Sequence, residues 1–448
     1  MSRRFVISSV VLLVALAAGA RTRPHYGGSV RVEISGDPWQ MSDGLARRLV
    51  LDTLTTLSDS GSAEPALATQ WQADNAAHRW EFSIRPGVHF HDGTPLTAEL
   101  VAASLQQTCA APVTGGCPWS TVRAVGSSVI FTSESPLPDL PELLAQTQFA
   151  IARQDATGAL DGTGPFRVTG FANGALTLTA DDDCWQGRPY LDAIQIFPHR
   201  TMRDQALDLS IGRADLIEVA PDVIRQAQQQ HLAVLVSQPV DLLALTIAPE
   251  GPLANLQTRQ SIALAVDRAA LYNVIFQKQG EISASLLPAS LSGYSFLFPA
   301  ERNLDRARSV RGPVPPGTLS LSVIDATPSL QLAAERLALN LREDGFNVQI
   351  TNGSHPGAQL TLRRVHLQAT APRAALDEMA AQFGQNGRVN GADPVALWQS
   401  EQAILVNGTI VPLVWLPRAW AAGDRVRDLR LSPDGVPLLA NAAVEGAQ

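Results

Sequence analysis

Three short clusters of polar side chains have residue types and spacings that could support chemistry. His89 and His91 alternate, so a strand would place both imidazoles on one face, and Asp92 could add an oxygen ligand for a metal ion. The segment 162–164, Gly-Thr-Gly, begins like a dinucleotide-binding fingerprint. The three aspartates at 181–183 could attract calcium. A metal site, a nucleotide site and a calcium site are therefore the alternatives to weigh.

Each cluster lacks something that its chemistry requires. No further His or Cys lies close enough to complete a metal site, and His91-Asp92-Gly93 is typical of a turn. Pro165 follows the two glycines and Arg167 occupies the position of the third, so no phosphate-binding turn is expected. Consecutive carboxylates lack the alternating spacing and the glycine of a calcium loop. Without a nucleophile motif elsewhere, we predict no catalytic residues, no metal and no cofactor, and therefore no enzyme.

The three cysteines are distributed in a way that indicates one disulfide. Cys109 and Cys117 flank a short loop rich in glycine and proline, and in an oxidising compartment we expect them to pair. Cys184 is then unpaired. Next to Trp185 it is expected to be a buried apolar residue.

The first twenty residues have the features of a secretory signal peptide. Arg3 and Arg4 precede an uncharged apolar run from Phe5 to Ala18, and small residues follow at 18–20. The run is shorter than the roughly 20 residues of a membrane-spanning helix. We therefore predict a signal peptide at residues 1–20 and a soluble mature protein in the periplasm.

Length and charge limit the classes of partner. The 448 residues are enough for two or three domains. The 34 basic and 42 acidic residues give a formal net charge of −8, so no general attraction to phosphate backbones is expected. Nucleic acid is not predicted as a partner.

The elements that must position these residues alternate along the chain between strands and helices. Apolar residues alternate with polar ones at 28–35 and 80–84, which predicts half-buried strands, and the apolar stretch 412–420 predicts another. Helical spacing predicts helices from Thr97 through Leu105, from Asp267 through Ile275, and over 330–342. This mixture places the protein in the α/β class.

Seven segments, taken in order, resemble those of the extracytoplasmic solute-binding protein family 5 (peptide/nickel-binding type) of ABC transporters. The longest is 82–99, FSIRPGVHFHDGTPLTAE, which is similar to the family's FxLRxGVKFHDGxPLTAED. The others are 64–71 (EPALATQW), 162–167 (GTGPFR), 184–192 (CWQGRPYLD), 212–217 (GRADLI), 259–268 (RQSIALAVDR) and 410–415 (IVPLVW). Their common order makes coincidence a poor explanation.

The resemblance implies a two-lobed periplasmic-binding-protein-like clamp (type II) with an extra inserted domain. Transferred to this chain, the boundaries are residues 27–57, 162–246 and 417–448 for lobe 1, 58–161 for the inserted domain, and 247–416 for lobe 2. It also implies a function as the periplasmic substrate-binding component of an ABC importer. A small solute, peptide-like or other, would bind in the interlobe cleft by hinge closure, and a monomer would deliver it to a permease complex in the inner membrane.

The same resemblance suggests ligand-binding positions. Asp52, Thr53 and Leu54 align with the family's EGL at the edge of the cleft. Thr246 stands near the cleft Asn of the family's LxFN, and Trp415 replaces a tyrosine on the strand that reaches the cleft from the C-terminal side. Each of the five has packing in the protein interior as an alternative role.

This chain also departs from the family between residues 355 and 397. The stretch is shorter than usual, and it lacks the segment with tryptophan and aspartate that holds a peptide's amino terminus. Peptide is therefore not singled out as the solute. The alternative function is a periplasmic scaffold or signalling module that keeps the fold with a degenerate binding cleft.

Overall fold

The computed structural model describes residues 26–40, 44–58, 60–110, 117–154, 158, 160–294, 297–313, 317–324, 327–355, 357–385 and 393–445. The predicted signal peptide, residues 1–20, lies outside the described residues. Over the described ranges, no helix combines the length and hydropathy needed to cross a membrane.

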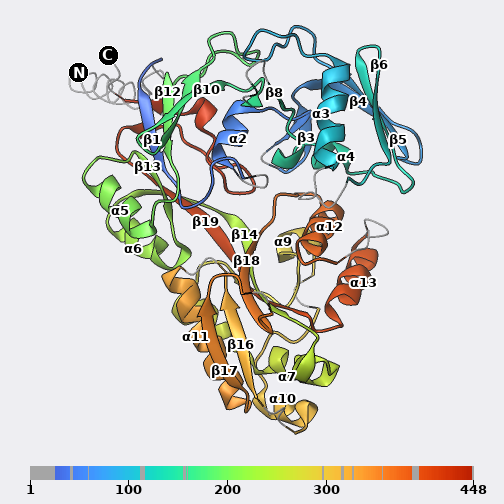
Figure 1. Ribbon diagram of the computed structural model, residues 1–448, viewed down its shortest axis with the longest axis vertical. Coiled ribbons are helices and arrows are strands. Elements are labelled where there is room, and N and C mark those ends of the chain that lie inside the picture. The colour runs from blue at the N-terminus through green and yellow to red at the C-terminus, as the bar shows by residue number, and fades with distance from the viewer. Residues whose placement is uncertain are drawn as a thin grey trace, which may run out of the picture.

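A mixed sheet of eleven strands extends from the upper to the lower part of the molecule (Figure 1). Its order is β10-β11-β12-β1-β13-β19-β14-β18-β16-β17, and β15 pairs with β19 outside this path. The strands are β1 (Ser29–Glu33), β10 (Phe166–Ala172), β11 (Ala175–Ala180), β12 (Ala193–Phe197), β13 (Leu216–Val219), β14 (Ala233–Ile247), β15 (Glu281–Ile282), β16 (Thr318–Val323), β17 (Asn347–Asn352), β18 (Leu360–His366) and β19 (Ile410–Ala422).

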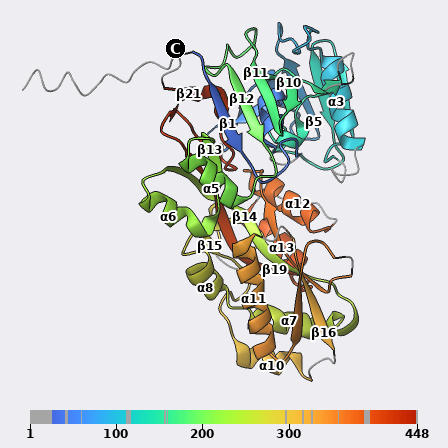
Figure 2. The same ribbon diagram turned by 60° about the vertical axis from the view of Figure 1, so that its left-hand side comes forward.

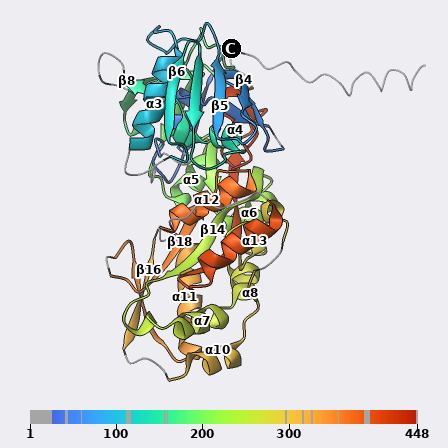
Figure 3. The same ribbon diagram turned by 90° about the vertical axis from the view of Figure 1, so that its right-hand side faces the viewer.

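We name three parts by their elements. The upper lobe contains β10, β11, β12, β1 and β13, and the lower lobe contains β18, β16 and β17. The side domain contains a separate four-stranded sheet of order β4-β5-β7-β6, which lies beside the upper lobe at the upper right in Figure 2 and faces the viewer in Figure 3. Its elements are β4 (Ala68–Ala73), β5 (Arg79–Ile84), β6 (Thr121–Val125), β7 (Ser128–Thr132) and α3 (Ala98–Ala110).

The remaining elements are short strands and the helices that cover the sheets. The strands are β2 (Thr55–Leu57), β3 (Ala63–Pro65), β8 (Arg153–Gln154), β9 (Leu160–Asp161), β20 (Val426–Arg427) and β21 (Ala443–Val444). The helices are α2 (Leu45–Val50), α4 (Leu140–Leu143), α5 (Met202–Ser210), α6 (Ile224–Gln229), α7 (Leu256–Ala265), α8 (Arg268–Ala270), α9 (Ala289–Ser292), α10 (Leu304–Arg311), α11 (Pro328–Glu343), α12 (Pro372–Gln382) and α13 (Pro394–Leu405).

Two long antiparallel strands, β14 and β19, belong to both lobes. At one end Ala233 pairs with Ala422 next to β13, and at the other end β14 lies between β19 and β18. Midway, Pro239 faces Pro417, and the register shifts on both sides of this pair. Proline has no N–H to donate to the ladder, so the hydrogen bonds between the strands are interrupted at the level where the lobes meet.

Each part has its own hydrophobic core. In the upper lobe, Val30 and Val32 of β1 are fully buried. In the side domain, Phe82 and Phe131 are in edge contact within the core. In the lower lobe β14 is buried on both faces, because Leu243 and Leu245 belong to one core and the alternating Leu242 and Ala244 to another. The predicted α/β class and the two-lobed clamp are confirmed.

The six segments predicted from local signals coincide with observed strands and helices. The alternation at 80–84 forms β5, and α3 begins next to Thr97, whose hydroxyl accepts the N–H of Leu100 at 3.3 Å. Asp267 accepts the N–H of Ala270 at the start of α8. These are the capping interactions expected from their positions before apolar periodic segments.

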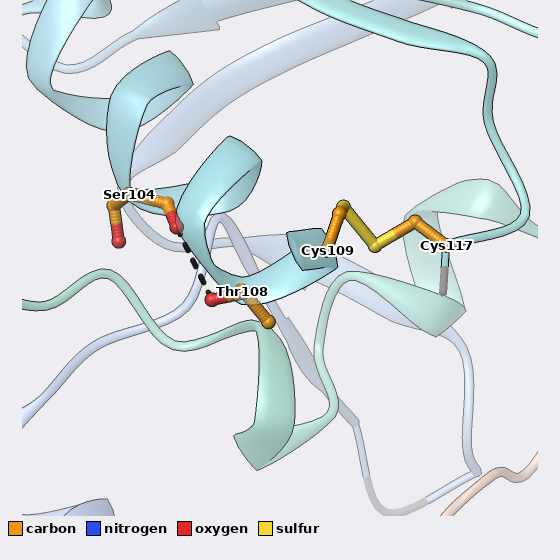
Figure 4. Close-up of a disulfide and its surroundings, with 4 residues drawn as sticks. All are labelled: Ser104, Thr108, Cys109 and Cys117. Atoms are coloured by element: carbon orange, nitrogen blue, oxygen red, sulfur yellow. Dashed lines mark hydrogen bonds between the residues drawn. A yellow bond between two sulfur atoms is a disulfide. The ribbon is translucent and has the colours of Figure 1, made fainter. Parts of the chain in front are cut away.

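The disulfide links the end of α3 to the segment before β6. Cys109 and Cys117 are joined with an S–S distance of 2.03 Å (Figure 4). Both side chains pack against the core of the side domain. Cys184 is unpaired and buried, and its burial raises the pKa of its thiol to about 11. That thiol is therefore almost wholly protonated at neutral pH and poorly nucleophilic.

Candidate binding site between the lobes

Asp52, the first of the predicted ligand contacts, lies where the upper lobe meets the side domain. Its backbone forms an isolated bridge with Ile151. Its carboxylate accepts hydrogen bonds from Trp185 Nε1 at 2.8 Å, Thr163 Oγ1 at 2.9 Å and Gln186 Nε2 at 3.3 Å. Burial raises the pKa of Asp52 to about 6, although the bonds from Trp185 and Thr163 act to lower it. The carboxylate is thus bound by side chains of its own protein.

Thr53 and Leu54 are also engaged locally. The Thr53 hydroxyl donates to the carbonyl of Thr55 at 2.6 Å. Leu54 is fully buried in the core of the side domain. These contacts fit the alternative role of packing in the protein interior. Thr53 is half-buried and is therefore more accessible than Leu54.

The other two predicted contacts lie on the long strands. The Thr246 hydroxyl donates to the carbonyl of Thr361 at 3.3 Å, near the lower end of β14. Trp415 is fully buried on β19, in the same core as Leu367 and Ala369. In the described part of the chain, its indole Nε1 has no hydrogen-bond partner. The hydrogen bonds of the Asp52 carboxylate go to residues 163–186, so none of them joins Asp52 to Trp415 or Thr246.

A buried group of charges joins the lobes where β14 and β19 cross between them. We call Asp241, His366, Arg418, Asp434 and Arg48 the hinge cluster. His366 Nδ1 lies 2.7 Å from Asp241 Oδ1, and Arg418 Nε donates to the same oxygen at 3.0 Å. His366 Nε2 lies 3.7 Å from Asp434 Oδ2, and Asp434 pairs with Arg48 of the upper lobe. The imidazole therefore stands between an aspartate on a shared strand and one held by the upper lobe.

The hinge cluster strongly changes the acidity of its members. Burial acts to raise the pKa of Asp241, but Arg418, His366 and Arg364 outweigh it and hold the pKa well below its usual range. Asp434 is shifted in the same direction, with Arg48 as the main cause against burial. For His366, burial and Arg418 act to lower the pKa, but the hydrogen bond with Asp241 and the nearby charge of Asp434 act more strongly to raise it, so the net shift is upward.

The raised pKa of His366 predicts a pH-dependent stability. A base whose pKa is higher in the folded state stabilises the fold fully below its unfolded value, about 6.5, and this contribution is lost as pH rises through the folded value. The free energy of unfolding should therefore fall as pH rises above about 6.5. Urea titrations of the wild type and of His366→Gln across this range measure it.

The variant His366→Gln should show a shallower decline, because an amide does not titrate, whereas Glu378 keeps its raised pKa and still contributes part of the decline. A His89→Gln variant is the matched control, since His89 is exposed on the side domain and lies outside the hinge cluster. The explanation is wrong if the decline is as steep in His366→Gln as in the wild type, or becomes shallower in His89→Gln.

A second contact joins the lower lobe to the side domain. Arg373 of α12 donates to Asp139 Oδ1 at 2.6 Å and to the carbonyl of Pro136 at 2.7 Å. The Thr370 hydroxyl donates to the carbonyl of Gly61 at 2.8 Å. The ion pair between Arg373 and Asp139 is largely shielded from water, because Arg373 is only 8% exposed. The lower lobe and the side domain are therefore held together on the α12 side by side chains of the protein itself.

The chain between these two contacts is the best candidate for a binding site. Residues 366–373, which we call the junction segment, run from the hinge cluster to the contact with the side domain. Glu378 accepts the N–H groups of Gln368 and Ala369 at 3.0 and 2.9 Å, and burial raises its pKa to about 7. Gln368 Oε1 is buried and, among the described residues, unpaired, as is Trp415 Nε1. Unpaired buried polar atoms often indicate an absent water or ligand.

Sequence reasoning missed the hinge cluster and the junction segment. One signal was present: Asp241 interrupts the apolar run 240–245, and His366 follows Val365 at the end of a segment with apolar residues at 360, 362 and 365. A charged residue within a buried strand needs a partner, so each of these two could have been marked as one half of an internal pair.

The polar clusters that suggested metal or nucleotide chemistry are structural. His91 Nε2 is hydrogen-bonded to the carbonyl of Gly164 at 2.8 Å, which ties the turn after β5 to the upper lobe, and His89 is exposed. Gly164 lies so close to the backbone of Val50 that a Cβ atom at position 164 would be 2.8 Å from the carbonyl oxygen of Val50. No group of three or more metal-ligating side chains occurs in the described ranges.

Comparisons with known proteins agree on one family. A family model described as bacterial extracellular solute-binding proteins, family 5 Middle, matches residues 62–371. The nickel-binding protein NikA of Staphylococcus aureus is 22% identical over 315 residues, which are 67% of this chain and 64% of that protein. The chain spans about half the length of the curated relatives that it matches, between 40% and 64% for three of them.

Solved structures show the same architecture. NikA from S. aureus in complex with Ni(L-His)2 superposes with a TM-score of 0.78 at 17% identity, covering 93% of this chain and 100% of that one. DppA from Helicobacter pylori in complex with the peptide STSA has a TM-score of 0.81 at 18% identity, covering 94% and 99%. At such identities the likeness shows the fold alone.

Proposed function

Because this chain belongs to the bacterial extracellular solute-binding proteins, family 5, we propose that it is the substrate-binding component of an ABC importer. It would bind a small solute between its lobes and present the closed form to a permease complex in the inner membrane. The observation that carries this proposal is the pair of shared strands, β14 and β19, whose ladder is interrupted at Pro239 and Pro417. An interrupted ladder between two rigid cores is a place where a hinge can bend.

The proposed solute contacts are the polar groups at the junction segment. Gln368 Oε1 can accept a hydrogen bond and Trp415 Nε1 can donate one, and both are buried and unpaired among the described residues. Glu378 adds one carboxyl group close by. Asp52 and Thr53 would border the opened cleft from the upper lobe, while Leu54 and Thr246 would support the walls.

The solute class follows from these groups and from the relatives. One of the solved structures holds a nickel–histidine chelate and another a short peptide. An amide acceptor, an indole donor and one carboxyl group suit a small polar solute with its own amide or amino groups. We propose such a solute, either an amino-acid chelate or a short peptide.

We also propose a domain organisation and a cellular compartment for this chain. Lobe 1 would consist of residues 27–57, 162–246 and 417–448, the inserted domain of 58–161 and lobe 2 of 247–416, since each contains its own core. The family consists of solute-binding proteins, which are not enzymes, and works outside the cytoplasm. We propose the same here: a periplasmic monomer, exported by a signal peptide, without catalytic activity. The net charge of −8 supports the absence of a nucleic-acid partner.

One observation favours a second candidate function. Arg373 and Asp139 already hold the lower lobe against the side domain, and Thr370 adds a hydrogen bond to Gly61. A clamp that its own side chains keep shut could serve as a periplasmic scaffold or signalling module with a degenerate cleft.

A solute screen separates these functions. Protein purified natively should carry a small molecule that mass spectrometry identifies, and a panel of peptides, amino-acid chelates of nickel, opines and sugars should contain a stabilising ligand. At a hundredfold excess over its dissociation constant, a ligand stabilises the fold by about 2.7 kcal/mol, seen as a raised melting temperature.

The matched variants are Gln368→Ala and Gln228→Ala. Gln368→Ala should weaken the thermal shift, whereas Gln228 is exposed on α6 and its replacement should leave the shift unchanged. If no member of the panel shifts the melting temperature and solution scattering shows no change in shape, the transport function is rejected in favour of the scaffold.

A further inference from the structure

A partly open cavity lies in the lower lobe, and no residue of the junction segment lines it. A cavity of about 220 Å³ is bounded by α7, α10, the end of α13 and the first residues of β19. α7 and α10 lie side by side at the bottom of the lower lobe in Figures 1 and 3. Most of its wall is apolar, including Leu264, Phe298, Val310 and Ile410. An apolar cavity of this kind is poorly suited to ordered water and suited to an apolar group.

Two arginines stand in this wall, and no acidic residue does. Arg268 is 3% exposed and donates from Nε to the carbonyl of Pro412 at 2.8 Å and from Nη1 to that of Ala263 at 3.1 Å. It forms no ion pair with any described residue, and its burial lowers the pKa of the guanidinium to about 10. The two carbonyls fix its orientation and leave its charge uncompensated.

Three other arginines near α10 pair with acids, whereas Arg308 donates to the carbonyl of Glu343. Arg302 pairs with Glu343, Arg336 with Asp267 at 3.1 Å, and Arg311 lies 4.0 Å from Asp344. Arg306, on the same helix, is exposed, borders the cavity and has no ion pair in the described part of the chain. Arg268 and Arg306 therefore both border the cavity, and neither has an ion pair among the described residues. A buried charge without a counter-ion is costly, so an anion would be bound favourably there.

We propose that this cavity binds an amphiphilic carboxylate, with its alkyl chain among the apolar walls and its carboxylate between Arg268 and Arg306. At about 30 Å³ for each water-sized group, the space holds on the order of seven such groups. A straight chain of six to eight carbons has this size. Arginine presents a planar fork of donors that suits a carboxylate. The site is independent of the solute proposed for the junction segment.

Octanoate is the probe, and 1-octanol, which has the same chain without the charge, is its control. Isothermal titration calorimetry of the full protein should show saturable binding of one octanoate per chain, with octanol at least about tenfold weaker because it lacks a charged group for the arginines. Absence of saturable octanoate binding overturns the proposal, and so does equal affinity for octanol.

Two surface variants locate the site without disturbing the core. Arg306→Gln should weaken octanoate binding about fivefold, the loss of one partly exposed ion pair. Val406→Glu places a like charge at the wall, where Val406 is 47% exposed, and should weaken it about tenfold.

Each variant has a control with the same chemical change elsewhere. Arg203→Gln on α5 and Val395→Glu on α13 alter exposed residues outside the cavity wall. Both should bind octanoate like the wild type, as should Gln368→Ala. If Arg306→Gln and Val406→Glu bind as tightly as these controls, octanoate binds elsewhere and the proposal is wrong.

Discussion

Asp241→Asn is expected to lower the free energy of unfolding by about 3–5 kcal/mol, because it removes the negative charge from a buried group of cations. Asp241 is 1% exposed, and Arg418 and His366 both bond to its carboxylate. Arg364 lies 3.7 Å from it. An amide keeps the shape of the side chain but leaves these positive charges without a partner where the lobes meet. Urea denaturation of both proteins at neutral pH measures the difference.

The matched control is Asp182→Asn. Asp182 pairs with Arg188 at 2.7 Å, but its side chain is 76% exposed. An exposed pair of this kind contributes at most about 1 kcal/mol. If Asp241→Asn costs no more than Asp182→Asn, the hinge cluster does not stabilise the fold as its geometry implies.

The Trp415→Ala variant is expected to lose a similar amount, about 3–5 kcal/mol, as large-to-small changes at buried aromatic residues do. The side chain of Trp415 is fully buried and packs against Leu242, Leu367 and residues of α12. The loss should be present without any solute, because the cavity left by the indole is inside the core. Thermal or urea unfolding of the solute-free variant tests this.

Trp398→Ala is the control for the same change of residue. Trp398 is on α13 and 37% exposed, so less of its surface leaves water on folding and its removal should cost less. A Trp415→Phe variant keeps most of the packing and loses only the Nε1 donor. Weakened solute binding in Trp415→Phe with near-normal stability would assign the indole N–H to the solute, whereas unchanged binding would leave Trp415 a packing residue only.

Local structure and family membership were both predictable from the sequence. The alternation at 80–84 formed β5, and helical spacing at 330–342 formed α11. Such periodicity is decided within one element, because the burial of a face depends on spacing of 2 or 3.6 residues along the chain. The ordered motifs predicted the family and the two-lobed fold, and both are confirmed.

The resemblance identified family positions but did not predict the contacts of the individual side chains at those positions. The resemblance aligned Asp52, Leu54 and Trp415 with family positions, but an alignment does not say which way a side chain points or what it touches. In the structure Asp52 is bound by Trp185 and Thr163, and Leu54 and Trp415 are fully buried. Their role toward a solute stays a proposal for the opened form.

By itself the sequence determined the class of fold, the family and several of the longer secondary-structure elements. Only the tertiary structure decided that Asp241 meets His366 and Arg418, and that Asp434 and Arg48 approach them from the upper lobe. The physical reason is that these residues are separated by up to hundreds of positions, and sheet order and strand register decide their pairing. Periodicity along one strand carries no information about either.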